Sequence, residues 1–349
     1  MRATFVFQNP RAELLRGVAA GSEPDSTLLG ANHLAGHGID ARVYDALLTR
    51  RPLPAPVDRL AWNLRELTLP FELGRTDVLF TPMANLAPLG ARARRLPTVV
   101  VNYGLNLIRR RATPRRRALL DRSLRASARV ICLGESQQAE LLADGFPPEL
   151  LDVMLVPIDE RFFTPREEAA TEHVVLTVGK DLSRDYRTFL AACGDLDARL
   201  ELVVHPRNLE SLVSPRNARV QRVSSIDLRS LYAEAACVVV PQRADTYAYG
   251  SEGGGLTALL EAMAMGRAVV ATERAILRDY VDDGVEALLV PPEDPAAMRA
   301  AIERVLGDPE LARSLGAAGR ARVERAHTTR GFAAQLAPLL RDVVYGGRT

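Results

Sequence analysis

Residues 252–266 read EGGGLTALLEAMAMG, three adjacent glycines followed by an apolar stretch that carries one carboxylate. The spacing of the apolar positions predicts a helix after the glycines. Glycines directly before a helix let backbone N–H groups approach an anion closely, and the helix dipole adds partial positive charge there. Glu261 follows Gly255 by about 9 Å along the helix axis, a separation that fits phosphates at the helix start and ribose hydroxyls at the carboxylate. A flexible turn and a helical glutamate paired with an arginine fit the spacing alone equally well.

On both sides of this stretch, short apolar segments alternate with amphipathic ones, a pattern that predicts two α/β domains with parallel sheets. The expected strands are residues 3–7, 40–44, 77–80, 97–102, 129–133, 173–178, 200–204, 237–241, 268–271 and 287–290. Expected helices include residues 28–37 and 117–125. We expect an N-terminal domain over residues 1–160 and a C-terminal domain over residues 161–330. A helix within residues 331–349 would pack back on the first domain.

Two aspartate–proline pairs predict further helix starts in the second half. Asp294 and Asp308 each place a side-chain acceptor at a cap position, with proline at the first helical position. Met298, Ile302 and Val305 then fall on one face at helical spacing, so we expect that face to be buried.

The composition is that of a globular protein that does not bind polyanions. The chain has 349 residues, 47% of them hydrophobic, and a formal net charge of +2. Its cysteines, Cys132, Cys193 and Cys237, lie in apolar surroundings without a CxxC pair, and no histidine spacing is typical of a metal site. Without a signal peptide or a bilayer-length apolar run, we expect a cytoplasmic protein, with attachment to the inner membrane face left open.

A second candidate site is the segment VGKDLSRDY at residues 178–186. A strand ends at Val178, a glycine turns the chain, and two cations, Lys180 and Arg184, follow before a helix. One interpretation is a pair of cations aimed at phosphate oxygens. The alternative is a solvated loop whose cations pair with neighbouring aspartates at low net value. Lys180 is the only lysine in an arginine-rich chain, which favours the first interpretation.

The sequence from Glu252 through residues 267–272, 279–284 and 289–295 resembles the C-terminal domain of glycosyltransferase family 4. The resemblance extends over roughly residues 170–330 and is specific. It implies the α/β GT-B fold, two Rossmann-like domains with parallel sheets that face each other across a cleft. It also implies a retaining transferase that moves a sugar from a nucleotide-diphosphate sugar, of the UDP or GDP type, to an acceptor hydroxyl. No metal or other cofactor is expected.

Site residues follow from the same resemblance. Glu261 matches the glutamate that binds the nucleotide ribose, and the basic pair Lys180 and Arg184 matches cations that neutralise the departing diphosphate. The turn that holds the diphosphate and the sugar corresponds to Gly253, Gly254, Gly255, Leu256 and Thr257. Eight residues, not the family's seven, separate Glu252 from Glu261. Either a one-residue bulge lets Glu252 still reach the sugar, or Gly253 leaves that position vacant; three adjacent glycines favour the bulge.

The first half resembles the family less closely. Residues 17–23 match a glycine-rich loop that would face the donor phosphates and the acceptor, with Gly21 and Ser22 as candidates, although a plain surface loop fits as well. Many members carry a histidine at the end of the fourth strand, where this chain has Asn102 and Tyr103. Tyr103 is therefore the acceptor-side candidate, and a histidine-assisted mechanism is in doubt.

Arginines cluster at residues 109–117, around Pro114. They could contact anionic lipid headgroups or a phosphorylated lipid acceptor, or form a solvated loop, which the lack of bulky apolar anchors favours. The acceptor itself could be a small molecule, a glycan or a lipid-linked compound. Two rival functions are a nucleotide-sugar epimerase of the same fold and a non-catalytic basic binding protein. Nucleic acid is not an expected partner, because no aromatic residue lies within the arginine cluster.

Overall fold

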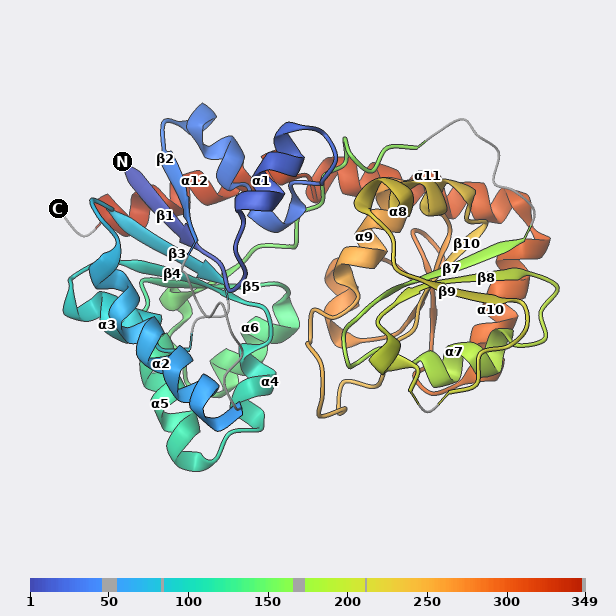
Figure 1. Ribbon diagram of the computed structural model, residues 1–349, viewed down its shortest axis with the longest axis horizontal. Helices are drawn as coiled ribbons and strands as arrows, with labels where there is room; N and C mark the ends of the chain where they lie inside the picture. The colour runs from blue at the N-terminus through green and yellow to red at the C-terminus, as the bar shows by residue number, and fades with distance from the viewer. Residues whose placement is uncertain (46–54, 83–84, 166–172, 211, 347–349) are drawn as a thin grey trace. The chain divides into compact units, whose positions relative to one another are not determined.

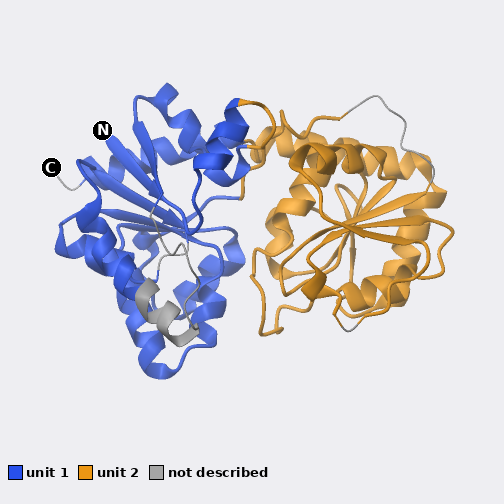
Figure 2. Ribbon diagram, in the orientation of Figure 1, with its two compact units in different colours: residues 1–19, 25–155, 329–349 blue, residues 20–24, 156–328 orange. Residues whose placement is uncertain are grey.

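The computed structural model describes residues 1–45, 55–82, 85–165, 173–210 and 212–346. The chain forms two compact units, coloured separately in Figure 2, and each is described by itself. Unit 1 comprises residues 1–19, 25–155 and 329–349, and unit 2 comprises residues 20–24 and 156–328. Of the expected C-terminal segment, residues 347–349 lie outside the described residues.

The core of unit 1 is a six-stranded parallel sheet with the order β2-β1-β3-β4-β5-β6 (Figure 1). Its strands are β1 Arg2–Val6, β2 Asp40–Tyr44, β3 Val78–Pro82, β4 Thr98–Asn102, β5 Arg129–Cys132 and β6 Leu151–Val153. The central strands β3 and β4 are buried at every position, as expected of a sheet covered on both faces. All five strands that the sequence predicts in this half are present.

Helices cover this sheet on both sides. They are α1 Ala12–Ala19, α2 Ala55–Glu72, α3 Ala87–Ala93, α4 Leu105–Arg110, α5 Pro114–Leu124, α6 Glu135–Ala143 and α12 Thr329–Tyr345, with 3₁₀ turns at Ser26–Leu28, Ala31–His37 and Pro148–Leu150. The last helix, α12, packs on unit 1, where Arg129 Nη2 donates to Asp342 Oδ2 at 2.6 Å.

The helix expected over residues 28–37 is wrong. Leu29 and Gly30 have positive φ angles of 52° and 74°, so the segment is two 3₁₀ turns with a left-handed break between them. The break brings Gly30 against the backbone of Ala333 in α12. Tertiary packing therefore overrides an apolar pattern that is typical of a regular helix.

Unit 2 also contains a six-stranded parallel sheet, with the order β12-β11-β10-β7-β8-β9. Its strands are β7 Val174–Gly179, β8 Arg199–Val204, β9 Ala218–Gln221, β10 Cys237–Val240, β11 Val269–Thr272 and β12 Leu288–Val290. The sequence predicts all of these except β9. None of the residues of this edge strand is fully buried, so it lacks the apolar run that identifies the others.

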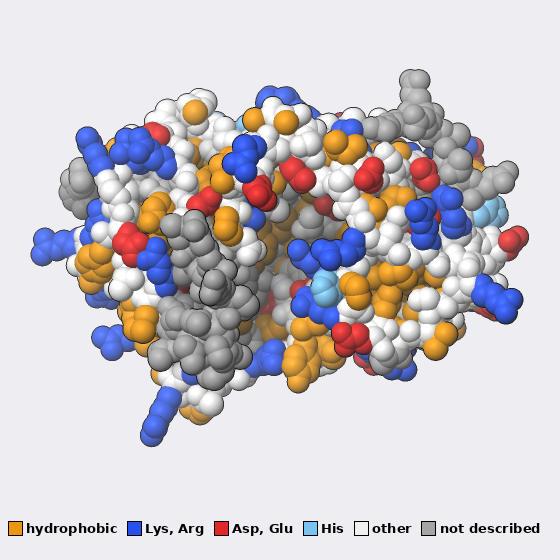
Figure 3. Space-filling view, viewed as in Figure 1, with side chains coloured by type: hydrophobic (Ala, Val, Ile, Leu, Met, Phe, Trp, Pro, Cys, Tyr) orange, Lys and Arg blue, Asp and Glu red, His pale blue; other side chains and the backbone are white. Residues whose placement is uncertain are grey.

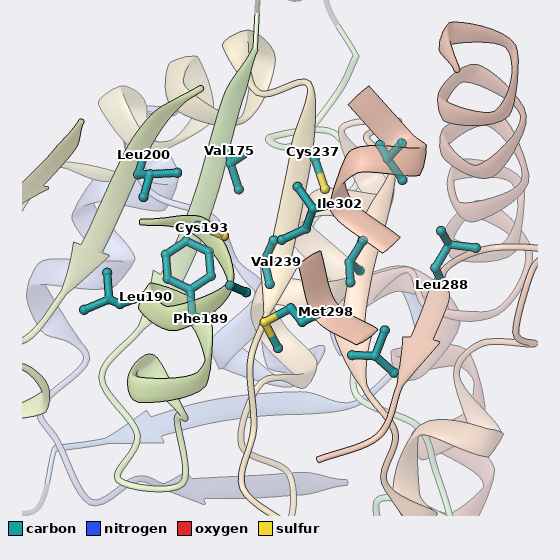
Figure 4. Close-up of a cluster of buried hydrophobic side chains, with 14 of the residues drawn as sticks. Val175, Phe189, Leu190, Cys193, Leu200, Cys237, Val239, Leu288, Met298 and Ile302 are labelled. Carbon is teal, nitrogen blue, oxygen red and sulfur yellow. The ribbon is translucent and has the colours of Figure 1, made fainter. Parts of the chain in front are cut away.

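The helices of unit 2 begin largely where the sequence predicts. They are α7 Tyr186–Cys193, α8 Ser225–Glu234, α9 Leu256–Ala264, α10 Pro295–Gly307 and α11 Pro309–Ala326, with 3₁₀ turns at Pro206–Asn208 and Ala275–Asp279. Asp294 and Asp308 cap α10 and α11 through their side chains, as predicted. Figure 4 shows Met298 and Ile302 of α10 pointing into a buried apolar cluster beside Val239 of β10.

The three cysteines are free and buried, as their apolar surroundings predict. Cys193 and Cys237 belong to the core cluster of unit 2, and Cys132 belongs to that of unit 1. Burial raises the pKa of the Cys193 thiol to about 12, so this thiol is not poised as a nucleophile.

Candidate functional site

The candidate residues of unit 2 gather where the strand order of its sheet reverses. From β7 the chain builds outward through β8 and β9, and it then returns to β10 on the other side of β7. The loops that leave the carboxyl ends of β7 and β10 therefore diverge, and such a switch point is where open α/β sheets bind ligands.

These two loops are joined by hydrogen bonds at the switch point. The Ser183 hydroxyl donates to Gln242 Oε1 at 2.7 Å, and the Arg243 N–H donates to the Ser183 carbonyl at 2.8 Å. Asp181 Oδ1 accepts from the Ser251 N–H at 3.2 Å. The base of the site is thus a fixed scaffold built from both loops.

Arg184 is a buried cation with spare hydrogen-bonding capacity. Its exposed fraction is 7%, and its Nη2 donates to the Val178 carbonyl at 2.6 Å. Nε and Nη1 are buried and have no hydrogen-bond partner within the described residues, and no carboxylate there forms an ion pair with Arg184. A buried charge without a partner costs several kcal/mol. The arrangement is therefore that of a site built to receive an anion.

Gly179 makes room for this guanidinium. Its φ of 153° disfavours residues with a side chain, and a Cβ at this position would collide with Arg184 Nε. The glycine after β7 is thus required both by the backbone conformation and by the cation that packs over it.

The glycine-rich turn leads into α9 as the sequence predicts. Gly255 precedes the helix with a φ of 93°, and Leu256 and Thr257 begin its first turn. A Cβ at Gly255 would collide with Gln242 Nε2, which donates to the Gly254 carbonyl at 2.6 Å. The first turn of a helix has backbone N–H groups without intrahelical acceptors, so this end of α9 offers donors to an anion.

Glu261 lies within α9, with an exposed fraction of 8%. The Tyr232 hydroxyl, from α8, donates to Glu261 Oε2 at 2.8 Å. Burial raises the pKa of Glu261 to about 7, although the Tyr232 hydrogen bond and the charge of Arg184 both act to lower it. A buried carboxyl group with a raised pKa is typical of a functional site.

Lys180 differs from Arg184 in its surroundings. It is exposed, and its carbonyl oxygen accepts from Arg207 Nη2 at 3.0 Å. The neighbouring aspartates do not pair with either cation in the described part of the chain. Asp181 accepts from Ser183 and Ser251, and Asp185 caps α7. The interpretation of the loop as cations neutralised by those aspartates is therefore wrong.

Glu252 is buried in the turn that precedes the three glycines, where the Gly254 N–H donates to the Ser251 carbonyl at 3.0 Å. Gly253 contributes its carbonyl to the Leu256 N–H at 3.3 Å. Both residues thus lie at the start of α9, near the donors of the helix end.

The candidates from the N-terminal half are placed differently. Residues 17–23 do not form one loop, because Gly17 lies in α1 and the chain leaves the helix only after Ala19. Gly21, with a φ of 71°, and Ser22 belong to the short segment 20–24 that groups with unit 2. There the Ser225 hydroxyl donates to Glu23 at 2.5 Å.

Tyr103 follows β4 in unit 1, and burial raises its pKa above the ordinary value of a phenol. Asn102 is the last residue of β4, and its Oδ1 accepts from the N–H of Leu105, the first residue of α4, at 2.8 Å. Its Nδ2 donates to Asn106 Oδ1 at 3.0 Å. Asn102 therefore holds the start of α4 through a buried amide pair.

The arginine cluster is largely a structural network. Arg109 has an exposed fraction of 1% and donates to Asp121 at 2.6 Å and to Asp144 at 2.8 Å. Arg110 makes two hydrogen bonds to Glu140, and Arg117 pairs with Asp144 at 2.8 Å. The interpretation of residues 109–117 as one solvated or lipid-facing patch is therefore wrong for Arg109, which its carboxylate partners hold inside unit 1.

Two residues of the site, Gln242 and Tyr232, are not among those predicted from the sequence. Gln242 is a polar residue directly after a buried strand, and that position at the carboxyl edge of a parallel sheet could have identified it. Tyr232 could not be found, because its contact with Glu261 depends on how α8 packs against α9. Among the described residues, no group of three His, Cys, Asp or Glu could hold a metal ion.

Comparison with known proteins finds similar glycosyltransferases. Residues 172–308 match the family model described as "Glycosyl transferases group 1". The chain is 28% identical over 221 residues to the MMP alpha-(1->4)-mannosyltransferase of Mycolicibacterium hassiacum, covering 59% of this chain and 52% of that protein. It is 30% identical over 209 residues to the Alpha-1,3/1,6-mannosyltransferase ALG2 of Homo sapiens, covering 55% and 48%. The aligned part spans about half the length of these relatives.

Solved structures extend the likeness to the whole chain at the level of the fold. Sucrose-phosphate synthase from Thermosynechococcus elongatus has a TM-score of 0.78 at 19% identity, with 99% of this chain and 100% of that chain covered. HepE of Anabaena, solved in complex with UDP-glucose, has a TM-score of 0.71 at 14% identity, with 97% and 99% covered. Residues 172–308 therefore match the group 1 glycosyltransferases within the region where the sequence predicts that resemblance, and the whole chain has the GT-B-like fold of these solved structures.

The charged surface and the hydropathy of the helices show neither a basic stripe on the face drawn nor a membrane-spanning helix among the described residues. On the face drawn in Figure 3, basic and acidic side chains are interspersed rather than gathered into one basic stripe. A search of the described residues finds no helix with the length and apolar character needed to cross a bilayer.

Proposed function

We propose that this protein is a retaining glycosyltransferase that moves a hexose from a nucleotide-diphosphate sugar to an acceptor hydroxyl. The observation that supports this most strongly is the buried Arg184 guanidinium, whose Nε and Nη1 have no partner in the described chain. Burial raises the pKa of Glu261 and the charge of Arg184 acts against that rise, so we assign the cation and the carboxylate to one site. One anion and one diol would satisfy both groups.

The nucleotide diphosphate would lie along α9. Its phosphates would accept hydrogen bonds at the helix start, around residues 253–257, and from Arg184. The ribose hydroxyls would donate to Glu261, two turns further along the helix. Glu252 would contact the sugar through the bulged turn. HepE was solved with UDP-glucose, which supports a uridine nucleotide as the first ligand to test, with GDP next.

The chemistry would consist mainly of positioning and charge stabilisation. The bond between the anomeric carbon and the diphosphate oxygen breaks, and the acceptor oxygen bonds to that carbon on the same face. The acceptor proton passes to the departing diphosphate oxygen. Arg184 from inside the site and Lys180 from its rim stabilise the charge that develops on the leaving group, and no metal is required for that role.

Fewer residues point to the binding site of the acceptor than to that of the donor. Gly21, Ser22 and Tyr103 are retained as acceptor-side candidates. On α5 and the segment before it, Arg111, Arg115 and Arg116 are exposed and could hold a phosphorylated acceptor or an anionic membrane surface. The buried free thiols are consistent with a reducing, cytoplasmic location.

The test is a panel of UDP-, GDP- and ADP-sugars, read by binding and by slow hydrolysis of the donor without an acceptor. We expect binding of at least one nucleotide sugar and its hydrolysis with release of the nucleoside diphosphate. Absence of both would contradict the proposal. Epimerised donor in place of free sugar would favour the epimerase instead.

A variant and its matched control test the leaving-group role of Lys180. Lys180→Ala should slow hydrolysis, while Arg187→Ala, an exposed arginine on α7, serves as the matched control. If Lys180→Ala has the same rate as wild type, the leaving-group role of Lys180 is wrong, while the binding site at Arg184 and Glu261 still stands on its own test.

A further inference from the structure

Residues 243–251, between the end of β10 and the glycine-rich turn, form a loop that we call the tyrosine loop. It is held at both ends by the loop after β7. The Arg243 N–H donates to the Ser183 carbonyl at 2.8 Å, and the Ser251 N–H donates to Asp181 at 3.2 Å. Gly250 packs against Asp181 and Ser183 so closely that a Cβ would collide there.

A third attachment fixes the middle of the tyrosine loop. The Asp245 carboxylate accepts from Arg274 Nε at 2.8 Å and from the Ala275 N–H at 2.9 Å. The turn closes through the Tyr247 N–H, which donates to the Ala244 carbonyl at 2.9 Å. The loop is therefore ordered by the residues around the switch point.

This ordered loop displays two aromatic rings. Tyr247 and Tyr249 have exposed fractions of 37% and 51%, and their ring centroids lie 5.7 Å apart at an angle of 60°. The Arg243 guanidinium lies 5.7 Å from the centroid of Tyr247. Only 5% of the residues are aromatic, and most large hydrophobic side chains of the described chain are buried. Two exposed aromatic rings side by side therefore call for a functional explanation.

We propose that Tyr247 and Tyr249 form a platform that binds a pyranose ring of a saccharide acceptor. The inference rests on the proposed function and names its acceptor class. Tyrosine combines an apolar face, on which the C–H groups of a sugar can pack, with a hydroxyl that can bond to the hydroxyls of the sugar. The loop should lose little conformational entropy on binding, because it is already attached at three places.

The position of the rings favours a sugar over the base of the nucleotide. Tyr249 adjoins Gly250, which contacts the same Asp181–Ser183 segment as Gly254 at the start of α9. The rings thus lie at the phosphate end of the helix. Glu261 is about 9 Å further along the axis, so a ribose bound there would be separated from the rings.

The size of the platform argues against a protein partner. Two rings cover far less than the ~800 Å² that each partner contributes to a stable protein interface. A single sugar ring matches them in size. The exposed position also fits a ligand that arrives after the donor, because the donor sugar is proposed to lie at the buried turn of residues 252–257.

The experiment uses the full chain with saturating UDP and measures saccharide binding by saturation-transfer difference NMR. The probes are methyl α-mannoside and α-1,6-mannobiose, chosen because both curated relatives are mannosyltransferases, with maltose as a glucose counterpart. The variants are Tyr247→Ala, Tyr249→Ala and the double variant. Tyr345→Ala, a tyrosine of similar exposure at the end of α12, is the control.

We expect the wild type and Tyr345→Ala to bind at least one saccharide, and the double variant to bind it about tenfold more weakly. The thermal stabilisation by UDP should be the same in all five proteins. Unchanged saccharide affinity in the double variant, or no saccharide signal from wild type that binds UDP, would overturn the platform alone. Weaker UDP binding in the double variant would overturn it in favour of base stacking. A wild type that binds neither UDP nor GDP would instead contradict the proposed function.

Discussion

The two sheets of this protein end in similar carboxyl edges that hold very different polar groups. Both are six-stranded and parallel, and both have a point where the strand order reverses. In unit 1, the polar groups at the ends of β4 and β5 have partners: Asn102 Nδ2 donates to Asn106 Oδ1, and Asn106 Nδ2 donates to the backbone carbonyl of Gln137 at 3.1 Å. In unit 2, Arg184 retains two buried nitrogens without partners.

The difference shows how one architecture provides both a scaffold and a binding site. Arg109 and Arg184 are both buried arginines, but Arg109 has two carboxylate partners and Arg184 has none in the described chain. Similarly, Glu261 is buried where its ionisation is costly, whereas Asp144 lies beside arginines that hold its pKa below the usual range. We infer that the buried charges of unit 1, Arg109 and Asp144, stabilise the fold, whereas Arg184 and Glu261 of unit 2 bind a ligand.

The largest effect is expected at Arg184. Arg184→Met keeps the apolar stem and removes the charge, so donor hydrolysis should fall by about 10²–10³, the loss typical of a removed transition-state donor. The free energy of unfolding should change little or rise, because an unpaired buried charge is lost. The measurement is the hydrolysis rate beside a urea titration. A variant that is much less stable and fully active would reverse the assignment of Arg184 to the ligand.

Arg109 should show the opposite behaviour. Arg109→Met removes the partner of Asp121 and Asp144 and should lower the free energy of unfolding by about 3 kcal/mol. Nucleotide affinity of the folded protein should stay at the wild-type value, as measured by titration calorimetry below the unfolding range. Arg110→Ala, which breaks a more exposed pair with Glu140, is the control and should cost about 1 kcal/mol or less.

Glu261→Gln should make the protein more stable and a poorer binder. Because burial raises the folded pKa of Glu261 to about 7, above the ordinary 4.5, the folded state holds the proton more tightly than the unfolded state. The unliganded protein therefore loses up to about 3 kcal/mol of stability as pH rises from 4.5 to 7, and no more above that. In the glutamine variant this slope should disappear.

Nucleotide affinity should depend on pH in the opposite sense. The ionised carboxylate accepts the ribose hydroxyls better, so UDP should bind more tightly as pH rises through about 7 in wild type and without that dependence in Glu261→Gln. Urea titrations and calorimetry across this range measure both effects. If the affinity of wild type for UDP does not change with pH, the assignment of Glu261 to the ribose is wrong.

The smallest effect is expected at Tyr232, which positions Glu261. Tyr232→Phe removes the hydrogen bond to Oε2, so it should raise the pKa of the carboxyl further and shift the pH dependence of UDP binding upward. A lost hydrogen bond of about 1 kcal/mol corresponds to roughly fivefold weaker binding near neutral pH. A merely structural tyrosine would change stability and leave the midpoint of the pH profile where it is.

How much the sequence predicts depends on whether a feature is local. The buried strands, the helices capped by aspartate and the glycine-rich start of α9 follow from periodicity and capping chemistry, and the structure confirms them. The break at Leu29 and Gly30 and the exposed edge strand β9 depend on packing or lack an apolar signal, and the sequence misses both.

The same distinction holds for the site. Lys180 and Arg184 follow the end of β7, and Glu261 lies in the helix after the three glycines, so all three could be selected from the chain alone. The contact of Tyr232 with Glu261, the pairing of Ser183 with Gln242 and the burial of Arg109 join residues far apart in sequence. Only the folded chain shows that Arg109 has carboxylate partners and that Arg184 has none among the described residues.

The central claim is that a nucleotide diphosphate binds at the switch point of unit 2 through Arg184 and α9. The most direct measurement is thermal unfolding of wild type and Arg184→Met with increasing UDP and GDP. A ligand at about 100 times its Kd adds ~2.7 kcal/mol to the stability of a protein that binds it. We predict this stabilisation in wild type for at least one of the two nucleotides and little or none in Arg184→Met. Equal stabilisation of both proteins, or of neither, would contradict the account.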